Sequence, residues 1–505
     1  MGRGPPEMIE DPLSVPGVRE ISGSVRGGDR SAVAWLEAAI AADEAMRSSL
    51  NALVQRFQAR ALERARAVDR LPKDGSLSGV PISVKECFAV RGGLTTLGIR
   101  RRQSSVDADD APIVTRLERQ GAVLMGKANV PQAMYLHETD NPVWGRTNHP
   151  FNPERGPGGS SGGDAALVAA GVVAAAVGTD LAGSIRQPAH ACGVCGIVPS
   201  TDRLGLCGGF DTMPSLTVVR PRAGFIARAV GDLEAILAAV SPEVGSSPSA
   251  SRQFRVGWTV DTGPLQPSRA VVRAVEEAAA WLRRSGVEIS LVDGSIVEEA
   301  AWVHLAILSA DGGRDARRLF DTERPVPAVG RLLRLAGLPR ILRPGLAALA
   351  RLAGRRLEAA ALTATGPVVD AEFVEVVARR DALRERMRSF WRDRNGRLLD
   401  AVVMPVSSLP ALRHGSADRL ILAAAQCLLA NLFDLPAGTV PVTVVRPGET
   451  AGRTSSRDPV LRLAADSDAG SEGLPVGVQV VALDREESTL LTIMRIIESG
   501  RDVAR

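Results

Sequence analysis

Residues 156–163 read Gly156-Pro-Gly-Gly-Ser-Ser-Gly-Gly163, a glycine-rich turn that carries the two serines Ser160 and Ser161. Small apolar residues fill positions 165–178, and the run ends in Gly178-Thr-Asp-Leu-Ala-Gly-Ser-Ile-Arg186. Glycine permits positive φ angles and lets main-chain N–H groups approach a ligand closely. The pattern therefore predicts two serine-bearing turns, joined by one buried small-residue helix, that form a site from backbone.

The composition restricts the class of protein. The chain has 505 residues, of which 45% are hydrophobic and only 3% aromatic, and its formal net charge is +4. So few aromatic side chains and so balanced a charge argue against a nucleic-acid partner. The N-terminus has no apolar core of a signal peptide, and the apolar run at 165–178 is too short to span a bilayer. We expect a cytoplasmic protein with no signal peptide and no transmembrane segment.

Cysteine usage indicates a reducing compartment. The five cysteines are Cys87, Cys192, Cys195, Cys207 and Cys427. An odd and sparse set does not make a disulfide framework. Cys192 and Cys195 have the spacing of a redox pair or of half a zinc site, but no second pair of Cys or His at ligand spacing accompanies them. We interpret both as small buried residues.

Strands and helices alternate along the chain, which predicts an α/β fold with a mixed sheet. The segments that read as strands are 80–86, 122–125, 254–258, 287–292, 399–404, 439–445 and 476–481. The segments that read as helices are 31–69, 111–120, 230–240, 269–285, 370–395, 420–432 and 486–499. Residues 1–30, rich in Gly, Pro, Ser and charge, read as a loose N-terminal arm before one domain over 31–505.

Residues 325–360 differ from the rest of the chain. Seven arginines and no acid occur between Arg331 and Arg356, interleaved with leucines. Pro339 and Pro344 interrupt the pattern, which predicts two short helices joined by a turn. Such a basic amphipathic pair suits an anionic membrane surface. The alternative is a helical hairpin that packs on the body and leaves a solvated basic face.

A serine becomes a nucleophile when a base takes its proton and donors await the oxyanion. Of the five histidines, only His190 lies near a glycine turn, and no motif surrounds it, so a Ser-His-Asp triad is disfavoured. Lysine is the remaining base, and burial must lower its pKa for that role. Lys85 lies between apolar neighbours on the strand 80–86, which suits a buried base. The same pattern also fits a lysine on an edge strand that prevents aggregation.

Three segments together resemble the amidase signature family of serine hydrolases. They are Gly79-Val-Pro-Ile-Ser-Val-Lys-Glu86, Pro157-Gly-Gly-Ser-Ser-Gly-Gly163 and Gly178-Thr-Asp-Leu-Ala-Gly-Ser-Ile-Arg186. The resemblance implies the amidase signature fold, a large twisted mixed β-sheet covered by helices on both faces. It also implies hydrolysis by a Ser–Ser–Lys triad, with no metal or organic cofactor.

Residue by residue, the resemblance assigns the catalytic roles. Ser184 becomes the nucleophile, Ser160 the bridging serine after a cis peptide bond from Gly159, and Lys85 the base. Protons would pass from Ser184 through Ser160 to Lys85 and return to the leaving amine. The main-chain N–H groups of Leu181, Ala182, Gly183 and Ser184 would form the oxyanion hole, and Ala182 stands where the family more often has Gly. The resemblance also implies that the two turns are supported by Ser161, Asp180 and Arg186.

Within the family, similarity to the fatty acid amide hydrolases runs from about residue 30 to the end. It is carried by motifs such as Asn129-Val-Pro-Gln-Ala-Met134, Asn141-Pro-Val-Trp-Gly-Arg-Thr147 and Ser309-Ala-Asp-Gly-Gly-Arg314. It implies that the segment 325–356 is a helical cap that docks on membranes. Met134 and Tyr135 fall in the substrate pocket of those enzymes, although a core role fits them equally.

These observations predict a serine amidase for apolar acyl amides, either N-acyl amines or primary fatty amides. The partners that we expect are the small-molecule substrate and a membrane surface contacted by residues 325–356, and a homodimer is left open. One rival is a glutaminase-type subunit of a tRNA-dependent amidotransferase. The other is a non-catalytic protein of the same fold that binds membrane surfaces.

Overall fold

The computed structural model describes residues 16–70, 75–243, 252–453 and 456–504. Eleven strands form one mixed sheet in the order β1-β3-β2-β6-β8-β7-β12-β13-β11-β9-β10. In chain order these strands are β1 (Leu53–Arg56), β2 (Pro81–Lys85), β3 (Val123–Ala128), β6 (Ala175–Asp180), β7 (Cys195–Val198), β8 (Arg222–Ala227), β9 (Arg255–Trp258), β10 (Glu288–Leu291), β11 (Ala401–Pro405), β12 (Ala437–Val444) and β13 (Pro475–Ala482). The short strands β4 (Asp140–Asn141) and β5 (Gly145–Arg146) pair separately. The mixed α/β fold that the sequence predicted is confirmed.

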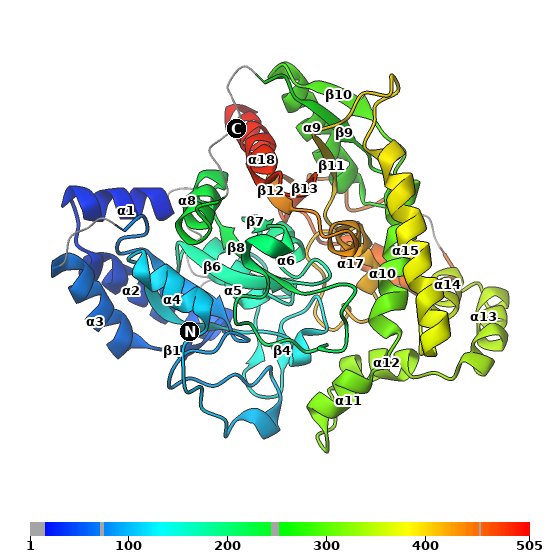
Figure 1. Cartoon of the computed structure of the whole chain (residues 1–505), viewed down its shortest axis with the longest axis horizontal. Coiled ribbons are helices and arrows are strands. Elements are labelled where there is room, and N and C mark those ends of the chain that lie inside the picture. The colour runs from blue at the N-terminus through cyan, green and yellow to red at the C-terminus, as the bar shows by residue number, and fades with distance from the viewer. Residues whose placement is uncertain (1–15, 71–74, 244–251, 454–455, 505) are drawn as a thin grey trace.

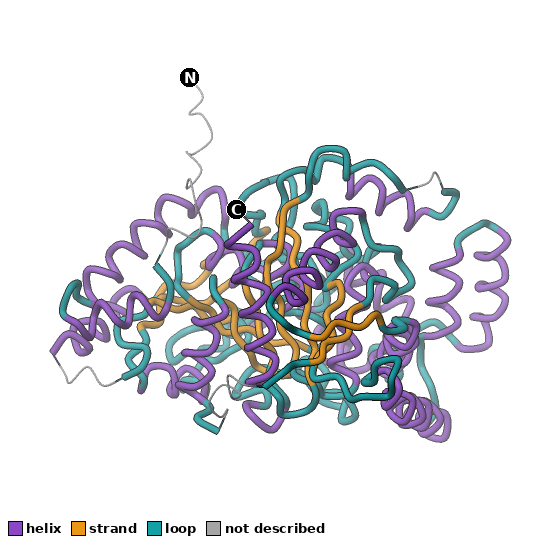
Figure 2. Tube along the Cα trace, turned by 90° about the horizontal axis from the view of Figure 1, so that it is seen from above, coloured by secondary structure: helices purple, strands orange, loops and turns teal. Residues whose placement is uncertain are grey.

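Helices cover both faces of the sheet, which runs through the middle of the molecule (Figure 2). The helices α4 (Pro112–Arg119), α8 (Val230–Val240), α18 (Glu487–Ala504) and α9 (Arg269–Arg284) contact one another in that order and form one layer. The helices α5 (Gly162–Ala169) and α6 (Arg186–Cys192) pack together on the other face. The central strands β2, β3, β6 and β8 are buried along their whole length because helices lie on both sides.

The small-residue run 165–178 is not one helix, which corrects the expectation from sequence. Helix α5 ends at Ala169, Gly171 adopts a φ of +71°, and the chain then enters β6. Alanine and valine fill both elements, so the run has no hydrophobic period that separates helix from strand. The consequence is that Ser184 follows the carboxyl end of a central strand.

The N-terminal region also differs from expectation. Helix α1 (Val18–Gly27) buries Val18, Ile21 and Val25, so the expected loose arm is wrong over these residues, while residues 1–15 lie outside the described part of the chain. The helix expected over 31–69 is instead α2 (Ala32–Leu50), the strand β1 and α3 (Gln58–Arg70). Asn51, with a φ of 49°, ends α2 and lets the chain turn into the sheet.

The segment 325–360 forms a helical cap at the opposite end of the molecule from α1–α3 (Figure 1). It contains α12 (Pro327–Ala336), the 3₁₀ turn η4 (Arg340–Leu342), α13 (Arg343–Leu352) and α14 (Arg356–Ala364). Pro339 and Pro344 lie at the junction between α12 and α13, as their positions in the sequence predicted. The segment therefore keeps its helices short and turns between them.

The remaining helices complete the chain. They are η2 (Arg100–Arg102), η3 (Gln132–Met134), α7 (Thr201–Leu204), α10 (Ser295–Ser309), α11 (Arg314–Phe320), α15 (Asp370–Phe390), η5 (Ile421–Cys427), α16 (Leu428–Leu432) and α17 (Pro459–Asp468). The predicted helix 420–432 is thus a 3₁₀ segment followed by one short α-helix. Across the described ranges, none of the helices has both the length and the apolar character needed to cross a bilayer. Cys192 and Cys195 are buried free thiols, as expected.

Candidate active site

The topology brings two parts of the site to one edge of the sheet. Strands β2 and β6 are parallel neighbours, with Ile82 opposite Ala175 and Val84 opposite Val177. Parallel neighbours end at the same edge, so Lys85, the last residue of β2, lies beside the end of β6. The turn that carries Ser184 begins directly after β6.

Lys85 is fully buried, and its Nζ is held by two hydroxyl groups. Nζ is 2.7 Å from Ser160 Oγ and 2.7 Å from Thr179 Oγ1, and it also donates to Thr179 O at 3.3 Å. Burial lowers the pKa of Lys85 below its usual value of 10.5, against the opposing effect of Cys87, Asp164 and Asp180. A buried lysine that is neutral can accept a proton from a serine hydroxyl. The alternative of an exposed edge-strand lysine is wrong.

The glycine-rich turn places Ser160 next to that lysine at the N-terminus of α5. The peptide bond between Gly159 and Ser160 is cis. The turn packs so closely that a Cβ on Gly159 would lie 2.5 Å from Leu136 O, and one on Gly163 would lie 2.5 Å from Asn129 N. Ser161 donates its N–H to Ser184 O at 3.0 Å, which joins the two serine-bearing turns.

Asp180 organises the turn around Ser184. Its carboxylate accepts the N–H groups of Gly183 at 2.9 Å and Ile185 at 3.0 Å. It also forms a fully buried salt bridge with Arg186, at 2.9 Å from Nη2. Despite burial, which alone would raise it, the pKa of Asp180 is held far below its usual range by Arg186 and by these N–H donors. Arg186 reaches further, to Cys427 O at 2.9 Å and Gln479 Oε1 at 3.1 Å, so the turn is fixed to the rest of the core.

Two features of the turn differ from the arrangement that the sequence suggested. The N–H of Gly183 is engaged by Asp180, which leaves the N–H groups of Leu181, Ala182 and Ser184 as the candidate oxyanion donors. The hydrogen bond between Ser160 and Ser184 that a proton relay needs is not among those of the described residues. Catalytic hydrogen bonds are often long in an enzyme without substrate and shorten when substrate binds.

Ser184 opens onto a cavity of about 500 Å³. Met134 and Tyr135 line the same cavity, and so do Leu181 and Ala182. Most of the wall is apolar, and its outer part comes from the cap helices and from η5: Leu332, Leu333, Leu335, Ala336, Leu357, Ala361, Leu362, Ile421, Leu422 and Ala424. Arg331 on α12 and Asp418 both line the cavity, and they form a salt bridge with each other. A volume of this size and polarity suits a small apolar ligand.

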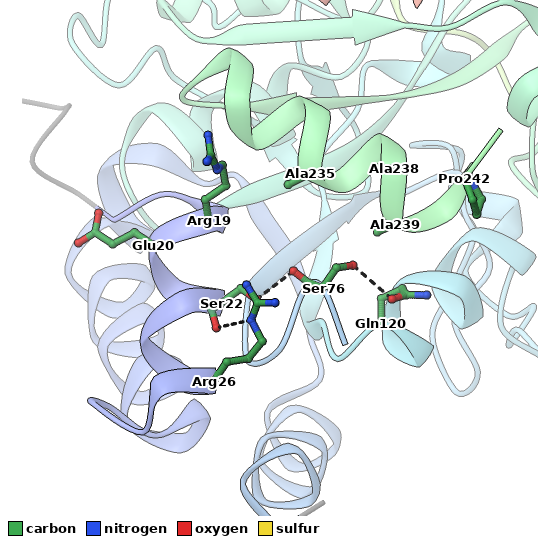
Figure 3. Close-up of a pocket in the computed structure, with 10 residues that line it drawn as sticks. All are labelled: Arg19, Glu20, Ser22, Arg26, Ser76, Gln120, Ala235, Ala238, Ala239 and Pro242. Atoms are coloured by element: carbon green, nitrogen blue, oxygen red, sulfur yellow. Dashed lines mark hydrogen bonds between the residues drawn. The ribbon is translucent and has the colours of Figure 1, made fainter. Parts of the chain in front are cut away.

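A larger hollow of about 760 Å³ lies elsewhere, between α1 and α8 (Figure 3). Its wall includes Arg19, Ser22, Ser76 and Gln120, and Ser22 Oγ donates to Ser76 O at 2.9 Å. The residues that line it include no nucleophile beside a base. The cavity lined by Ser184 is therefore the candidate active site.

The structure adds three polar residues that the sequence did not single out. One is Thr179, whose hydroxyl oxygen lies 2.7 Å from Lys85 Nζ. Asp164, buried at the start of α5, accepts from Ser83 Oγ at 2.9 Å, and burial raises its pKa to about 8. His137 lines the cavity and bonds Ala182 O at 3.1 Å. Thr179 and Asp164 lie within or beside the glycine motifs, but His137 is 45 positions from its partner, so no local pattern reveals it.

The chain matches one protein family and several known proteins over most of its length. The Amidase family model matches residues 34–491. The chain is 33% identical over 449 residues to fatty-acid amide hydrolase 1 of Sus scrofa, covering 85% of this chain and 76% of that protein. It is 28% identical over 473 residues to one subunit of the glutamyl-tRNA(Gln) amidotransferase of Koribacter versatilis (strain Ellin345), covering 90% of this chain and 92% of that protein. A solved structure of a fatty acid amide hydrolase superposes with a TM-score of 0.82 at 22% identity, covering 97% of this chain and 86% of that chain, which supports the fold.

Proposed function

The chain belongs to the amidase signature family of amide hydrolases, and from that membership we propose that it is a serine amidase for apolar acyl amides. Its substrates are N-acyl amines or primary fatty amides, and its products are the carboxylic acid and the amine or ammonia. The observation that carries this proposal is the largely apolar cavity of about 500 Å³ with Ser184 on its wall.

The mechanism that we propose uses Ser184, Ser160 and Lys85. Ser184 Oγ attacks the carbonyl carbon of the amide while its proton passes to Ser160 and the Ser160 proton passes to neutral Lys85. The oxyanion of the tetrahedral intermediate accepts main-chain N–H groups of the turn 181–184. Lys85 then returns a proton through Ser160 to the leaving nitrogen, and the C–N bond breaks to leave an ester on Ser184.

Water completes the cycle by the same relay. It loses a proton to the Ser160–Lys85 pair, attacks the ester carbonyl and releases the acid, and the proton returns to Ser184 Oγ. The short contact between Lys85 and Ser160 and the lowered pKa of Lys85 support this sequence of transfers. Protonation of the leaving nitrogen is the step that an amide requires and an ester largely does not.

The specificity test uses acyl amides of increasing chain length with the purified protein. Ala361 on α14 lines the cavity, so Ala361→Phe should shift the optimum toward shorter chains. Thr363 is exposed on the same helix, and Thr363→Phe is the control that should leave the optimum unchanged. The proposal fails if Ser184→Ala retains hydrolysis, or if a fluorophosphonate probe labels a residue other than Ser184.

Peripheral membrane contact is the second part of the proposal. The cap exposes Ile341 by 87%, Leu352 by 86% and Leu349 by 63%, although α12 and α14 of the same cap line the cavity. Five of the seven arginines are tied to the protein: Arg331 pairs with Asp418, Arg340 with Glu372 and Arg355 with Glu358, while Arg343 donates to the main chain at the end of α12 and Arg351 donates to Thr363 Oγ1. The exposed Ile and Leu side chains therefore support membrane contact more strongly than the charge does.

The glutaminase role is the alternative for the same chemistry. A relative of this class matches the chain over 90% of its length, so the fold alone does not exclude it. A glutaminase subunit releases ammonia from a small polar amide, for which a largely apolar cavity is poorly suited. The assay that separates the two roles compares glutamine with a long-chain primary amide on the purified single chain.

A further inference from the structure

One peptide group in the turn before Ser184 is held at both ends. The carbonyl oxygen of Ala182 lies 3.1 Å from His137 Nε2, and the N–H of Gly183 donates to Asp180 Oδ1 at 2.9 Å. This carbonyl and this N–H belong to the same planar peptide bond, so the two hydrogen bonds fix the orientation of its plane. The peptide lies between the N–H of Ala182 and the N–H of Ser184, both candidate donors to the oxyanion.

The turn needs such external support. Gly183 has a φ of +95°, and a Cβ there would lie 2.7 Å from Cys427 Cβ, so a larger residue does not fit. Glycine restricts its backbone torsion angles less than any other residue, so the adjoining peptide can rotate unless other groups hold it. Asp180 holds one end and is itself fixed by Arg186. The other end depends on His137.

The state of His137 follows from its surroundings. A carbonyl oxygen only accepts, so Nε2 must carry the hydrogen and donate. Burial lowers the pKa of His137 to about 4, so the ring is neutral at neutral pH, with Nδ1 unprotonated. The charged groups that face it, Asp180 and Arg186, have opposite effects on that pKa. The ring is thus a neutral donor of fixed tautomer on the wall of the cavity that holds Ser184.

We propose that His137 is a positioning residue for amide hydrolysis, which orients the oxyanion donors of the turn 181–184 by holding the Ala182–Gly183 peptide through its Nε2–H. The inference rests on the proposed function. Loss of the donor frees that peptide to rotate. The N–H groups of Ala182 and Ser184 then no longer point toward the same oxyanion. The cost falls on the transition state, where the oxyanion exists, rather than on binding of the neutral substrate.

The test compares His137→Leu with His137→Gln in the full chain, using a long-chain primary amide. Leucine fills the space without a donor, whereas the amide nitrogen of glutamine can replace Nε2. His137→Leu should lower kcat by about 10- to 100-fold with KM changed less than about 3-fold, and His137→Gln should stay within about 5-fold of the unmodified protein. If His137→Leu does not fold, His137→Met supplies a second side chain without a donor.

A second measurement reports on the oxyanion directly. Ser184 Oγ attacks the carbonyl carbon of a trifluoromethyl ketone that has the same acyl chain, and the adduct is a tetrahedral anion. The carboxylic acid product forms no such adduct. The donor-free variants should lose affinity for the ketone by about the same factor as kcat and keep their affinity for the acid. Three results would overturn the inference. The first is an equal loss of kcat in His137→Leu and His137→Gln, and the second is an effect on KM alone. The third is a kcat of the donor-free variants within 2-fold of that of the unmodified protein.

The outcome also separates this inference from the proposed function. If the unmodified protein hydrolyses no acyl amide and forms no adduct with the ketone, the proposed function itself fails. If the unmodified protein is active, Ser184→Ala is not, and the donor-free variants match the unmodified protein, only the role of His137 fails.

Discussion

Lys85 Nζ lies 2.7 Å from Ser160 Oγ, and both groups are buried in the core. A lysine so placed can exchange a proton with the serine without solvent between them. The first consequence concerns the choice of substrate. Lys85→Ala should lower amide turnover by about 10²- to 10⁴-fold and ester turnover much less, because an alkoxide leaving group needs little protonation. Rates on an amide and an ester with the same acyl chain test this.

Lys85→Met serves as the control for volume, since it keeps most of the side chain and removes the base. It should behave as Lys85→Ala does. Equal losses on the amide and the ester in both variants would refute Lys85 as the acid that protonates the leaving group.

The pH dependence of amide hydrolysis should report the buried lysine. Burial lowers the pKa of Lys85 below 10.5, so the neutral base is present at a lower pH than for an exposed lysine. kcat/KM should therefore rise with pH through this lowered pKa and reach its plateau before 10.5. A profile from pH 6 to 10.5 measures it, and a rise centred at the ordinary lysine value would contradict the neutral-base mechanism.

The Asp180–Arg186 pair should matter for stability as well as for activity. Both side chains are fully buried, so Asp180→Ala leaves the guanidinium without its counter-charge and the N–H groups of Gly183 and Ile185 without an acceptor. The loss should be about 3–5 kcal/mol in the free energy of unfolding. Urea denaturation measures it. Arg47→Ala, which removes an exposed partner of Asp43, should cost less than about 1 kcal/mol.

The exposed Ile and Leu side chains of the cap should govern binding to lipid vesicles. The triple variant Ile341→Ser, Leu349→Ser, Leu352→Ser should reduce binding to anionic vesicles by about 10-fold or more, since each buried leucine contributes on the order of 1.5–3 kcal/mol. Val374, 66% exposed outside the cap on α15, is the matched control as Val374→Ser. Vesicle co-sedimentation measures both variants. Unchanged binding of the triple variant would refute the membrane contact, and hydrolysis of a short soluble amide should stay the same.

Acid should destabilise the fold through its buried histidines. Burial lowers the pKa of His137 and of His149 to about 4 in the folded protein, whereas the ordinary value is near 6.5. Between these values the unfolded chain binds protons that the folded chain does not, so stability falls as pH falls from 6.5 to 4. The slope is about 1.4 kcal/mol per pH unit for each histidine.

The variant His149→Gln isolates one of these contributions, because glutamine can still donate to Ala191 O, which His149 Nε2 contacts at 2.8 Å. The decrease of Tm between pH 6.5 and 4.5 should be smaller in the variant than in the unmodified protein. An equal decrease in the two proteins would show that His149 does not titrate in this window.

The sequence predicted those parts of the fold that have a clear period or clear ends. The amphipathic helix α9 and the strands β2 and β10 lie close to where the pattern placed them. The stretch 165–178 was misread because alanine and valine suit a buried helix and a buried strand equally. Helix α17 lies between the predicted strands 439–445 and 476–481, where the sequence predicted no helix because Gly, Ser and Asp obscured a short apolar pattern.

The site was predictable where its residues belong to local motifs and not where they meet across the fold. Ser160, Ser184 and Lys85 stand in three recognisable segments. The engagement of Gly183 by Asp180 was not foreseen, because it depends on the shape of the turn. His137 was missed because only the packing of its loop against the turn 181–184 brings it to Ala182.

The pairing of β2 with β6, with Val84 opposite Val177, sets the alignment that brings Lys85 to Ser160. Side chains alternate between the two faces of a strand, so a slip by a single position would turn Lys85 away from Ser160 and put an apolar neighbour in its place. Ile82 and Val84 of β2 therefore do more than fill the core, because they hold the alignment that keeps Lys85 beside Ser160. Substitutions that loosen this alignment would reduce turnover while the protein still melts as one cooperative unit.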